Sequence, residues 1–493
     1  MKRLCLIFLC AVLLSATLKA QTLFEAINLS DQPIEGTARV MAMSGAFGAL
    51  GGDPSAIQIN PAGLGIYRSS EISFTLADTY TKTRTNWGVS QKNKGENVFD
   101  FSRISYVQSF LSGRKKGVIA SNFAISYNRS KSALIRLGFT GKEGAVSLST
   151  MMAEMGNGIS ELDMIGSAEK SPFDNEQVAW LPLMAYQDKL IEAKTGSSYQ
   201  ALNPTTAVAP TYNSLVNYAI DDIGISYATN INHLFYIGAD FSLKLYQCSE
   251  LSEYEEEDIF LGNQIETSGV GWNLKLGILA RPFSFWRVGF AYHTPTFYHV
   301  SKTTNPNLND TIFVEGSDAY RFISPSRYIF STAFLFGKKA ALDVEYEMID
   351  YQNMRYKSLY ATLNDGEENS FSKENSYIGA KANVAHSVKV GAEYRPFEFL
   401  SFRLGGAYVS PALKSDAEKI YPYNTIYTNM DYLLDKGSFC VSGGVGFRVK
   451  LWSFDLAYQF RRQMMDFVAF RGAEKAQLSA DYHKVLLTCA YRF

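Results

Sequence analysis

The sequence has no apolar run that would cross a membrane as a helix once its first twenty residues are set aside. A membrane-spanning helix needs about 20 consecutive apolar residues, and no such stretch follows residue 20. An all-helical membrane protein is therefore excluded. Basic residues are not in excess either, because 47 Lys and Arg stand against 48 Asp and Glu. Without a basic footprint we expect no nucleic acid partner.

Cysteine and histidine are scarce, with 5 of each in 493 residues. Three cysteines follow the first twenty residues, and this odd, widely spaced set is neither a disulfide framework nor a zinc site. The histidines are scattered without metal-ligand spacing, and no motif joins a nucleophile to a histidine. We therefore expect no metal, no cofactor and no enzymatic activity.

The first twenty residues have the organisation of a secretory signal peptide. Lys2 and Arg3 form the charged start, Leu4–Ala16 form an apolar stretch too short to span a bilayer, and Ala20 is a small residue at the expected cleavage site. An exported chain without a spanning helix is secreted, periplasmic or a membrane β-barrel.

Alternation of apolar and polar residues with period two runs through many later segments and is typical of β-strands. In the last segment Val485, Leu487, Cys489, Tyr491 and Phe493 share one face. The opposite faces of such segments carry charges with Gly, Ala and Ser. A soluble sandwich also alternates, but a charged face of this kind is typical of the lumen of a membrane barrel.

The lengths of the connections separate a membrane barrel from a soluble sandwich. We predict about fourteen strands, at roughly 69–81, 101–111, 118–131, 217–230, 235–249, 270–281, 286–299, 327–336, 340–350, 385–395, 399–409, 438–448, 451–462 and 482–493. The connections after even-numbered strands are short and those after odd-numbered strands are long. Bacterial barrels have short periplasmic turns, long outer loops and an even strand number. Residues 68–493 are thus predicted to form an all-β, transmembrane antiparallel β-barrel.

Aromatic residues support a membrane location, since the chain contains 33 Phe and 30 Tyr. Many of them flank the short connections, as an interfacial girdle does: Phe235, Tyr236, Phe283, Phe285, Trp286, Phe397, Phe399, Trp452 and Phe454. The chain also ends on Phe493, and a terminal aromatic strand resembles the signal read by outer-membrane barrel-assembly machinery.

Residues 21–67 do not alternate. This segment is rich in Gly and Ala and has turn signals at Asp53-Pro54 and Asn60-Pro61. Small residues allow close backbone approach, and a barrel of about fourteen strands is too wide for its own side chains to fill. We therefore predict that residues 21–67 are an N-terminal hatch inside the lumen.

Gly51–Leu64, which reads GGDPSAIQINPAGL, resembles the hatch motif of the FadL-like outer-membrane transporters of long-chain fatty acids and aromatic hydrocarbons. Asn60–Leu64 is its most specific part. Three later stretches match in the same order: Phe285–Tyr298, Ser324–Tyr346 and His386–Pro411. The resemblance runs nearly end to end.

The resemblance implies a plugged fourteen-stranded barrel that takes up a hydrophobic small molecule, fatty-acid-like or aromatic, by passive diffusion. The hatch is then the gate, formed by Asn60, Pro61, Ala62, Gly63 and Leu64. We expect Asn60 to hold the turn by side-chain hydrogen bonds, Pro61 to fix its shape and Gly63 to allow close packing. Well-known members release the ligand sideways beside a kinked third strand. This sequence departs there, because Val118–Asn128 contains no Gly or Pro.

A second interpretation stays open. FadL-like barrels also occur as non-transporting components of surface-protein secretion machinery, in which the barrel is a docking platform for a protein partner. A continuous apolar pocket in the lumen is expected of a transporter, and a loop surface that holds a protein is expected of a platform. Both interpretations place the chain in the outer membrane, as a monomer in contact with lipid and lipopolysaccharide.

The longest predicted loop, 131–217, is too long to be an idle connection. Ser147–Met155 and Val178–Lys194 are predicted to be short amphipathic helices. Their apolar side chains either pack on each other as a lid or form an outer ligand site helped by adaptable methionines. The two interpretations are compatible. The predicted ligand-binding residues are Met151, Met152, Met155, Trp180 and Met184.

Overall fold

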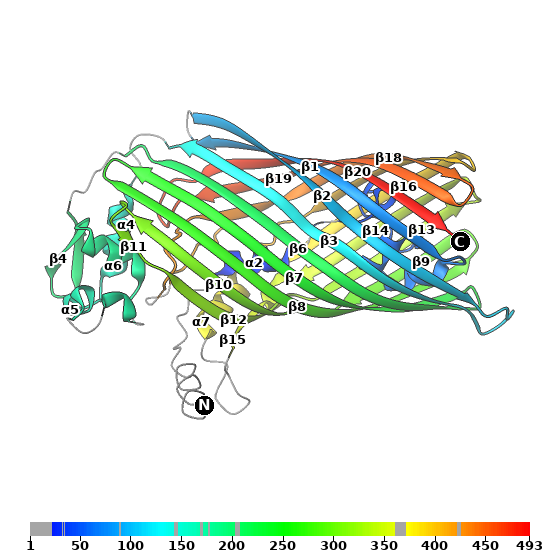
Figure 1. The fold of residues 1–493 in the computed structure, drawn as a ribbon, viewed down its shortest axis with the longest axis horizontal. Helices are drawn as coiled ribbons and strands as arrows, with labels where there is room; N and C mark the ends of the chain where they lie inside the picture. The colour runs from blue at the N-terminus through cyan, green and yellow to red at the C-terminus, as the bar shows by residue number, and fades with distance from the viewer. Residues whose placement is uncertain are drawn as a thin grey trace, which may run out of the picture.

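Fourteen antiparallel strands close into a barrel in the computed structural model (Figure 1). The structure describes residues 22–493 except 32, 34, 88–89, 142–145, 168–170, 176–177, 203–207, 360–370 and 422–424, so the predicted signal peptide lies outside it. The strands of the wall are β1 (Glu71–Trp87), β2 (Ser90–Leu111), β3 (Val118–Thr140), β6 (Thr211–Ile231), β7 (Phe235–Glu256), β8 (Ile259–Phe283), β9 (Trp286–His293) continued by β10 (Phe297–Leu308), β12 (Gly316–Ile323) continued by β13 (Arg327–Phe336), β14 (Ala340–Asp350) continued by β15 (Arg355–Ser358), β16 (Val384–Phe397), β17 (Leu400–Val409), β18 (Tyr432–Val449), β19 (Trp452–Val468) and β20 (Ala476–Arg492).

The first and last strands close the barrel. β1 pairs with β2 on one side and with β20 on the other, from Glu71↔Arg492 to Asn86↔Gln477. Closure gives every strand of the wall two neighbours, which a membrane requires because lipid satisfies no free backbone N–H or C=O group. The predicted count of fourteen strands is confirmed.

The strands are longer than predicted at their outer ends. β3 runs to Thr140 and β6 starts at Thr211, so the predicted loop 131–217 is corrected to 141–210. The two extensions pair with each other from Lys131↔Ile220 to Thr140↔Thr211. Polar residues occupy both faces of some extensions, and alternation therefore does not mark their ends.

Three neighbouring strands are interrupted at one level. The breaks are Thr294–Thr296 between β9 and β10, Ser324–Ser326 between β12 and β13, and the short helix η5 (Tyr351–Asn353) between β14 and β15. The first two contain Pro295 and Pro325, which have no N–H to donate to the ladder. The strands stay connected there, because the Thr296 N–H donates to Ser324 Oγ at 2.8 Å and the Ser324 N–H donates to the Thr296 carbonyl at 3.0 Å.

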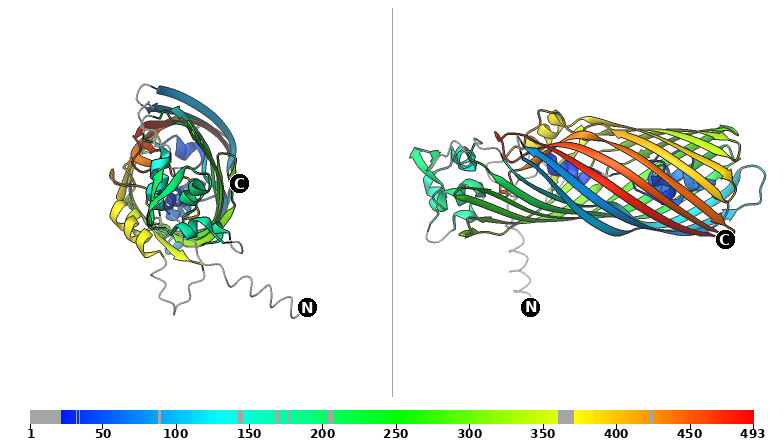
Figure 2. Two further views of the ribbon diagram at one scale, coloured as in Figure 1. Left: turned by 90° about the vertical axis from the view of Figure 1, so that its left-hand side faces the viewer. Right: turned by 90° about the horizontal axis from the view of Figure 1, so that it is seen from above.

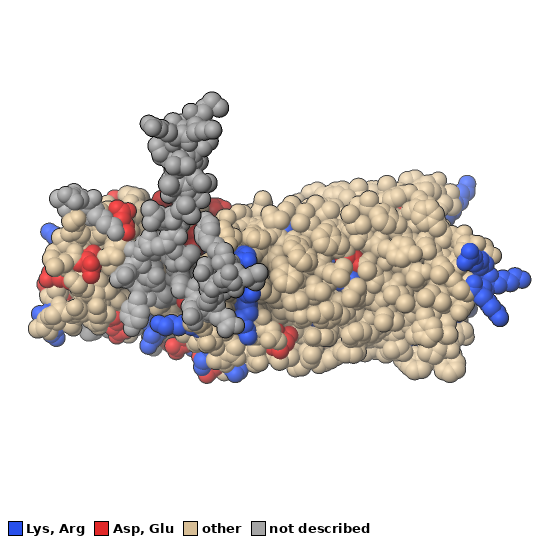
Figure 3. All heavy atoms as spheres, turned by 90° about the horizontal axis from the view of Figure 1, so that it is seen from below, with Lys and Arg blue, Asp and Glu red and all other residues tan. Residues whose placement is uncertain are grey.

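Large apolar side chains cover the outer wall. Leu404 is 70 % exposed and Phe336 61 %, while the inward residues of the same strands are mostly buried. Figure 3 shows a belt with few charges between one end where Lys, Arg, Asp and Glu gather and another end where Lys and Arg project. This inverted distribution is that of a membrane-spanning barrel. In the part of the chain that the structure describes, no helix is both long and apolar enough to traverse a bilayer.

The long connection after β3 builds a small subdomain beyond the outer end of the barrel (Figures 1 and 2). It contains α4 (Leu148–Gly156), α5 (Glu161–Ile165), η4 (Pro172–Asp174), α6 (Trp180–Gln187) and the hairpin of β4 (Ile191–Thr195) and β5 (Ser198–Ala201). We call residues 147–201 the outer subdomain. β11 (Ile312–Phe313) and α7 (Ser372–Lys381) lie in other outer connections.

The N-terminal segment lies inside the barrel, as Figure 2 shows in the view along the axis. Its elements are α2 (Leu23–Ser30), α3 (Ala38–Met41), η2 (Pro54–Gln58) and η3 (Pro61–Ile66). α3, η2 and η3 form the hatch proper near the short-turn end. α2 crosses the lumen nearer the outer loops.

Candidate functional site

Asn60 organises the turn that the resemblance singles out. Its Oδ1 accepts a hydrogen bond from the Ala62 N–H at 3.1 Å, which caps η3. Its Nδ2 donates to the carbonyls of Gly48 at 3.0 Å and Ile278 at 3.2 Å. The expected hydrogen-bonded turn is therefore present. The bond to Ile278 on β8 additionally ties the turn to the wall.

Three glycines on neighbouring strands form the groove that receives this turn. A Cβ added at Gly238 would lie 2.4 Å from the Pro61 carbonyl carbon, and one at Gly277 would lie 2.1 Å from Asn60 Oδ1. At Gly289 the nearest atoms would include Asn60 Nδ2 at 2.8 Å. Only residues without a side chain allow this approach. These glycines are not among the site residues predicted from the sequence. The sequence feature that could have identified them is a Gly at an inward position on each of three consecutive strands.

Pro61, Ala62, Gly63 and Leu64, the other residues of this turn, are buried between the hatch and the wall. The Gly63 carbonyl accepts from the Gly52 N–H at 3.1 Å, and a Cβ at Gly63 would lie 3.1 Å from the Cβ of Ala56. The Leu64 carbonyl accepts from Nδ2 of Asn122 on β3 at 2.8 Å. Asn60–Leu64 is therefore a buried joint between hatch and wall.

Buried ions fasten the opposite side of the hatch. Arg39 on α3 donates to Glu393 on β16, with an Nε–Oε2 distance of 3.0 Å, and Arg403 on β17 contacts the same carboxylate at 2.6 Å. The Asp343 and Glu345 carboxylates of β14 accept from backbone N–H groups of the hatch at Gly48, Ala49 and Leu50. These bonds hold the hatch proper from several sides.

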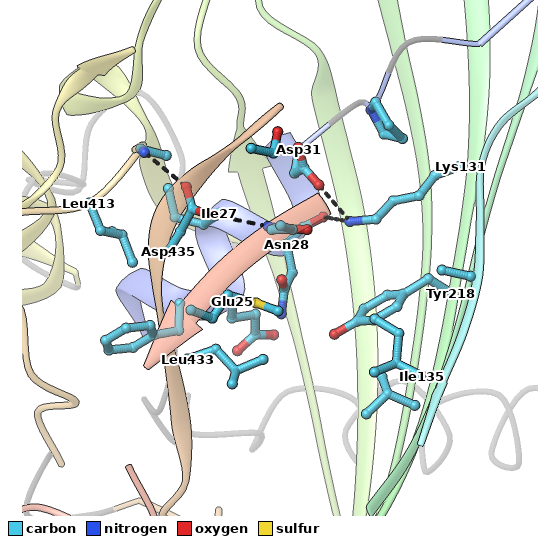
Figure 4. Close-up of a pocket in the computed structure, with 18 of the residues that line it drawn as sticks. Glu25, Ile27, Asn28, Asp31, Lys131, Ile135, Tyr218, Leu413, Leu433 and Asp435 are labelled. Carbon is cyan, nitrogen blue, oxygen red and sulfur yellow. Dashed lines mark hydrogen bonds and ion pairs between the residues drawn. The ribbon is translucent and has the colours of Figure 1, made fainter. Parts of the chain in front are cut away.

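A cavity of about 310 Å³ lies beside α2, between the hatch proper and the outer loops. This volume is within the range of small-molecule sites. Figure 4 shows apolar and charged side chains facing it together, among them Ile27, Ile135, Leu433, Glu25 and Lys131. Aromatic residues also line it, including Phe24, Tyr218, Tyr246, Phe467 and Tyr482. The cavity is thus amphipathic, and it suits a ligand with an apolar body and a polar end.

Helix α2 is held across the lumen by both of its ends. Near its start, Glu25 pairs with Lys302 of β10 at 3.0 Å and accepts from the Tyr320 hydroxyl. Near its end, Lys131 of β3 donates to the Asn28 carbonyl at 3.4 Å and pairs with Asp31 at 3.3 Å. These contacts make α2 one wall of the cavity.

A β-bulge in β3 places the side chain of Lys131 on the lumen side of the wall. The register of β3 against β6 shifts between Arg129 and Lys131, so Ser130 and Lys131 are both buried although they are consecutive. One extra residue reverses which side chains face the lumen. Without it, alternation from Asn128 would turn Lys131 outward.

Arg461 of β19 is an inward cation with an unusual environment. Its guanidinium carbon lies 4.2 Å from the centre of the Tyr482 ring, and the side chain lines the cavity. Among the residues that the structure describes, it has neither an ion pair nor a hydrogen bond from its guanidinium. A guanidinium has five N–H donors, so Arg461 offers unused donors to the cavity.

Glu35 and Lys484 form a neighbouring ion pair in which both charges are mostly buried. Burial raises the pKa of the Glu35 carboxyl, while the charge of Lys484 and, further away, that of Arg461 oppose this rise. Lys484 therefore already has an anionic partner, whereas Arg461 acts on Glu35 without contacting it.

The outer subdomain packs in an apolar cluster that continues onto the outer ends of the barrel strands. Met151, Met152 and Met184 are buried there with Leu181 and Leu183, and Met155 packs against the same cluster. Trp180 packs with Ile426 and Tyr427, and its Nε1 donates to the Phe173 carbonyl at 3.3 Å. The four methionines are thus brought together, Trp180 packs in a separate cluster, and none of the five is among the residues that line the cavity. An outer ligand site at them stays a prediction.

The wall is incomplete between β2 and β3. In the described residues, β2 pairs with β3 only from Arg103↔Asn128 to Leu111↔Ala120. Further out, side chains bridge the seam: Arg129 contacts Asp100 at 3.1 Å, and Lys92 donates to Thr140 Oγ1 at 2.9 Å. The third strand is therefore irregular without Gly or Pro: its pairing with β2 ends at Asn128, close to the bulge that shifts its register against β6.

Solved structures share this architecture, whereas no protein-family description and no curated protein matches the sequence. A FadL homologue from Pseudomonas aeruginosa superposes with a TM-score of 0.58 at 12 % identity, covering 94 % of this chain and 99 % of that one. The toluene transporter TodX from Pseudomonas putida superposes with a TM-score of 0.53 at 12 % identity and the same coverage. At this identity the likeness shows the fold, which is the fold that the hatch motif predicted.

Proposed function

We propose that this barrel, which shares the fold of FadL homologues, is an outer-membrane channel for passive uptake of a hydrophobic small molecule. The observation that carries the proposal is the amphipathic cavity between α2 and the outer loops. Apolar and aromatic side chains in the lining can bury the body of such a molecule, and the many charged side chains beside them suit a molecule that also has a polar end. The neighbours are a toluene transporter and a FadL homologue, and their roles agree with this chemistry.

The proposed route starts at the outer subdomain and enters the cavity. Tyr212 and Phe467 line the cavity and also belong to the apolar core of the outer subdomain. They therefore connect the lid to the ligand site. Beyond the cavity the hatch proper blocks the lumen, and a gate is required there.

Binding of labelled oleate to the purified barrel tests the proposal. We expect saturable binding that unlabelled oleate or toluene displaces and a hydrophilic sugar does not. The shift in gel mobility on heating reports that the barrel is folded. Folded protein without saturable binding would contradict uptake and favour the alternative function, a docking platform for a secreted protein.

We propose that Asn60–Leu64 acts as the gate. Asn60→Ala with Pro61→Ala removes three hydrogen bonds of the Asn60 side chain, each contributing about 1 kcal/mol. The barrel should fold, and uptake of labelled oleate by cells that display it should rise several-fold. Asn353→Ala is the matched control, because among the described residues its exposed side chain bonds only to Asp350, in the break between β14 and β15. Equal uptake by the double variant and the parent would argue against a gate at this turn.

A further inference from the structure

The short-turn end of the barrel carries basic side chains that uptake does not use. In the described segments that join strands at this end or lead from the hatch into β1, 7 Lys and Arg are exposed: Arg68, Arg114, Lys115, Lys116, Lys338, Lys339 and Lys450. We call these residues the basic rim. The same segments contain a single acidic residue, Glu398. No side chain of the basic rim forms an ion pair with a described residue.

The positive charge is a property of this end and not of the whole chain. The formal net charge of the protein is −1, so the remainder carries a compensating acidic excess. Figure 3 shows Lys and Arg side chains projecting from the short-turn end, with the uncharged belt beside them. The excess of basic residues at the short-turn end creates a positive electrostatic potential there.

Exposed apolar side chains place the basic rim at the level of lipid headgroups. Lys338 follows Phe336, which is 61 % exposed, and Lys450 precedes Trp452, which is 46 % exposed. Leu111, three residues before Arg114, is 60 % exposed. Interfacial aromatic residues mark the boundary between hydrocarbon and headgroups. Lys and Arg just beyond that boundary reach the phosphates.

The basic rim also reaches different sides of the barrel. One set lies between β2 and β3, another between β13 and β14, and Lys450 lies between β18 and β19. A protein partner would bind one patch, whereas the lipid leaflet surrounds the barrel. The positive charge of the basic rim, its position at the level of the headgroups and its spread around the barrel therefore favour lipid over an acidic protein as its partner.

We propose that the basic rim binds the phosphate groups of anionic phospholipids in the leaflet around the short turns, and so sets the depth of the barrel in the membrane. The interaction is electrostatic and will weaken with salt. It does not depend on the uptake function.

The test measures the midpoint temperature of thermal unfolding of the full chain in phosphatidylcholine vesicles with and without phosphatidylglycerol. The heat-dependent shift in gel mobility reports the unfolding. A lipid that binds only the folded barrel stabilises it, so phosphatidylglycerol should raise the midpoint, and high salt should abolish the rise. The rim variant, in which five residues become Gln, should lose most of the rise and keep its midpoint in phosphatidylcholine: Arg114, Lys115, Lys116, Lys338 and Lys339.

A matched variant removes the same number of exposed positive charges at the outer end, by changing Lys189, Lys194, Lys357, Lys373 and Lys475 to Gln. It should keep the full rise. The proposal is overturned if phosphatidylglycerol does not stabilise the parent, if the rim variant keeps the rise, or if both variants lose it equally. An equal rise from soluble polyglutamate would overturn the lipid assignment and indicate an acidic protein partner.

Discussion

Replacing Glu393 by Gln is expected to loosen the hatch and cost about 3–5 kcal/mol of stability, the usual cost of removing one partner from a buried ion pair. Glu393 receives three guanidinium groups, from Arg39 at 3.0 Å and from Arg395 and Arg403 at 2.6 Å. The carboxylate itself is only 5 % exposed. Without it, Asp455, which Arg403 contacts at 2.6 Å, is the remaining anion of this cluster.

Urea unfolding of the purified barrel measures the loss, and limited proteolysis reports whether the hatch becomes accessible. Glu398→Gln is the matched control, since Glu398 lies exposed on the neighbouring turn. Adding Arg39→Met to Glu393→Gln should recover part of the stability, because one uncompensated charge is removed with its partner. Wild-type stability and protease resistance of the single variant would refute the idea that this cluster fastens the hatch.

The second large effect is expected from Arg461→Gln, which should lower the affinity for oleate and leave toluene binding unchanged. The guanidinium faces the cavity over Tyr482. If the polar end of an amphipathic ligand accepts its hydrogen bonds, each charged bond contributes about 1.5–3 kcal/mol. That corresponds to roughly a 10- to 100-fold loss of oleate affinity.

Methyl oleate separates charge recognition from apolar burial. The parent protein should bind oleate more tightly than the ester, and Arg461→Gln should bind both alike. Arg462→Gln removes the same charge from the next residue of β19, where the side chain pairs with Asp481 at 2.6 Å and does not line the cavity. It should bind oleate as the parent does. Undiminished oleate binding by Arg461→Gln would remove this residue from the ligand site.

Much of the barrel was predictable because its determinants are local. A strand with one face toward lipid alternates with period two, as Val485–Phe493 does, and every strand of the wall contains such a stretch. The strand ends were less predictable. Beyond the membrane, residues such as Lys131–Thr140 continue the ladder. Ala133, Leu137 and Phe139 are buried there against the residues of the outer subdomain, a tertiary contact that period-two alternation does not reveal.

The hatch motif was visible in Asn60–Leu64, whereas the glycines of the wall that contact it were not. Gly238, Gly277 and Gly289 lie on the fifth, sixth and seventh strands of the barrel, far from Asn60 in sequence, and only the tertiary structure brings them against the turn. The methionines of the outer subdomain present the opposite case. Their apolar character was evident, but packing decided that they form a core in the subdomain and do not line the cavity.

The sequence by itself determined the fourteen strands, the sorting of short turns from long loops, and a small-residue segment able to lie in the lumen. Each of these follows from residue type and period. The tertiary structure alone decided which inward charges lack a partner and where the wall is open. Among the described residues Arg461 has no ion-pair partner, and its neighbours across the sheet are Cys440 and Tyr482. The seam beside β3 begins where its pairing with β2 ends, at Arg103↔Asn128. Both depend on distances between strands, which no single segment contains.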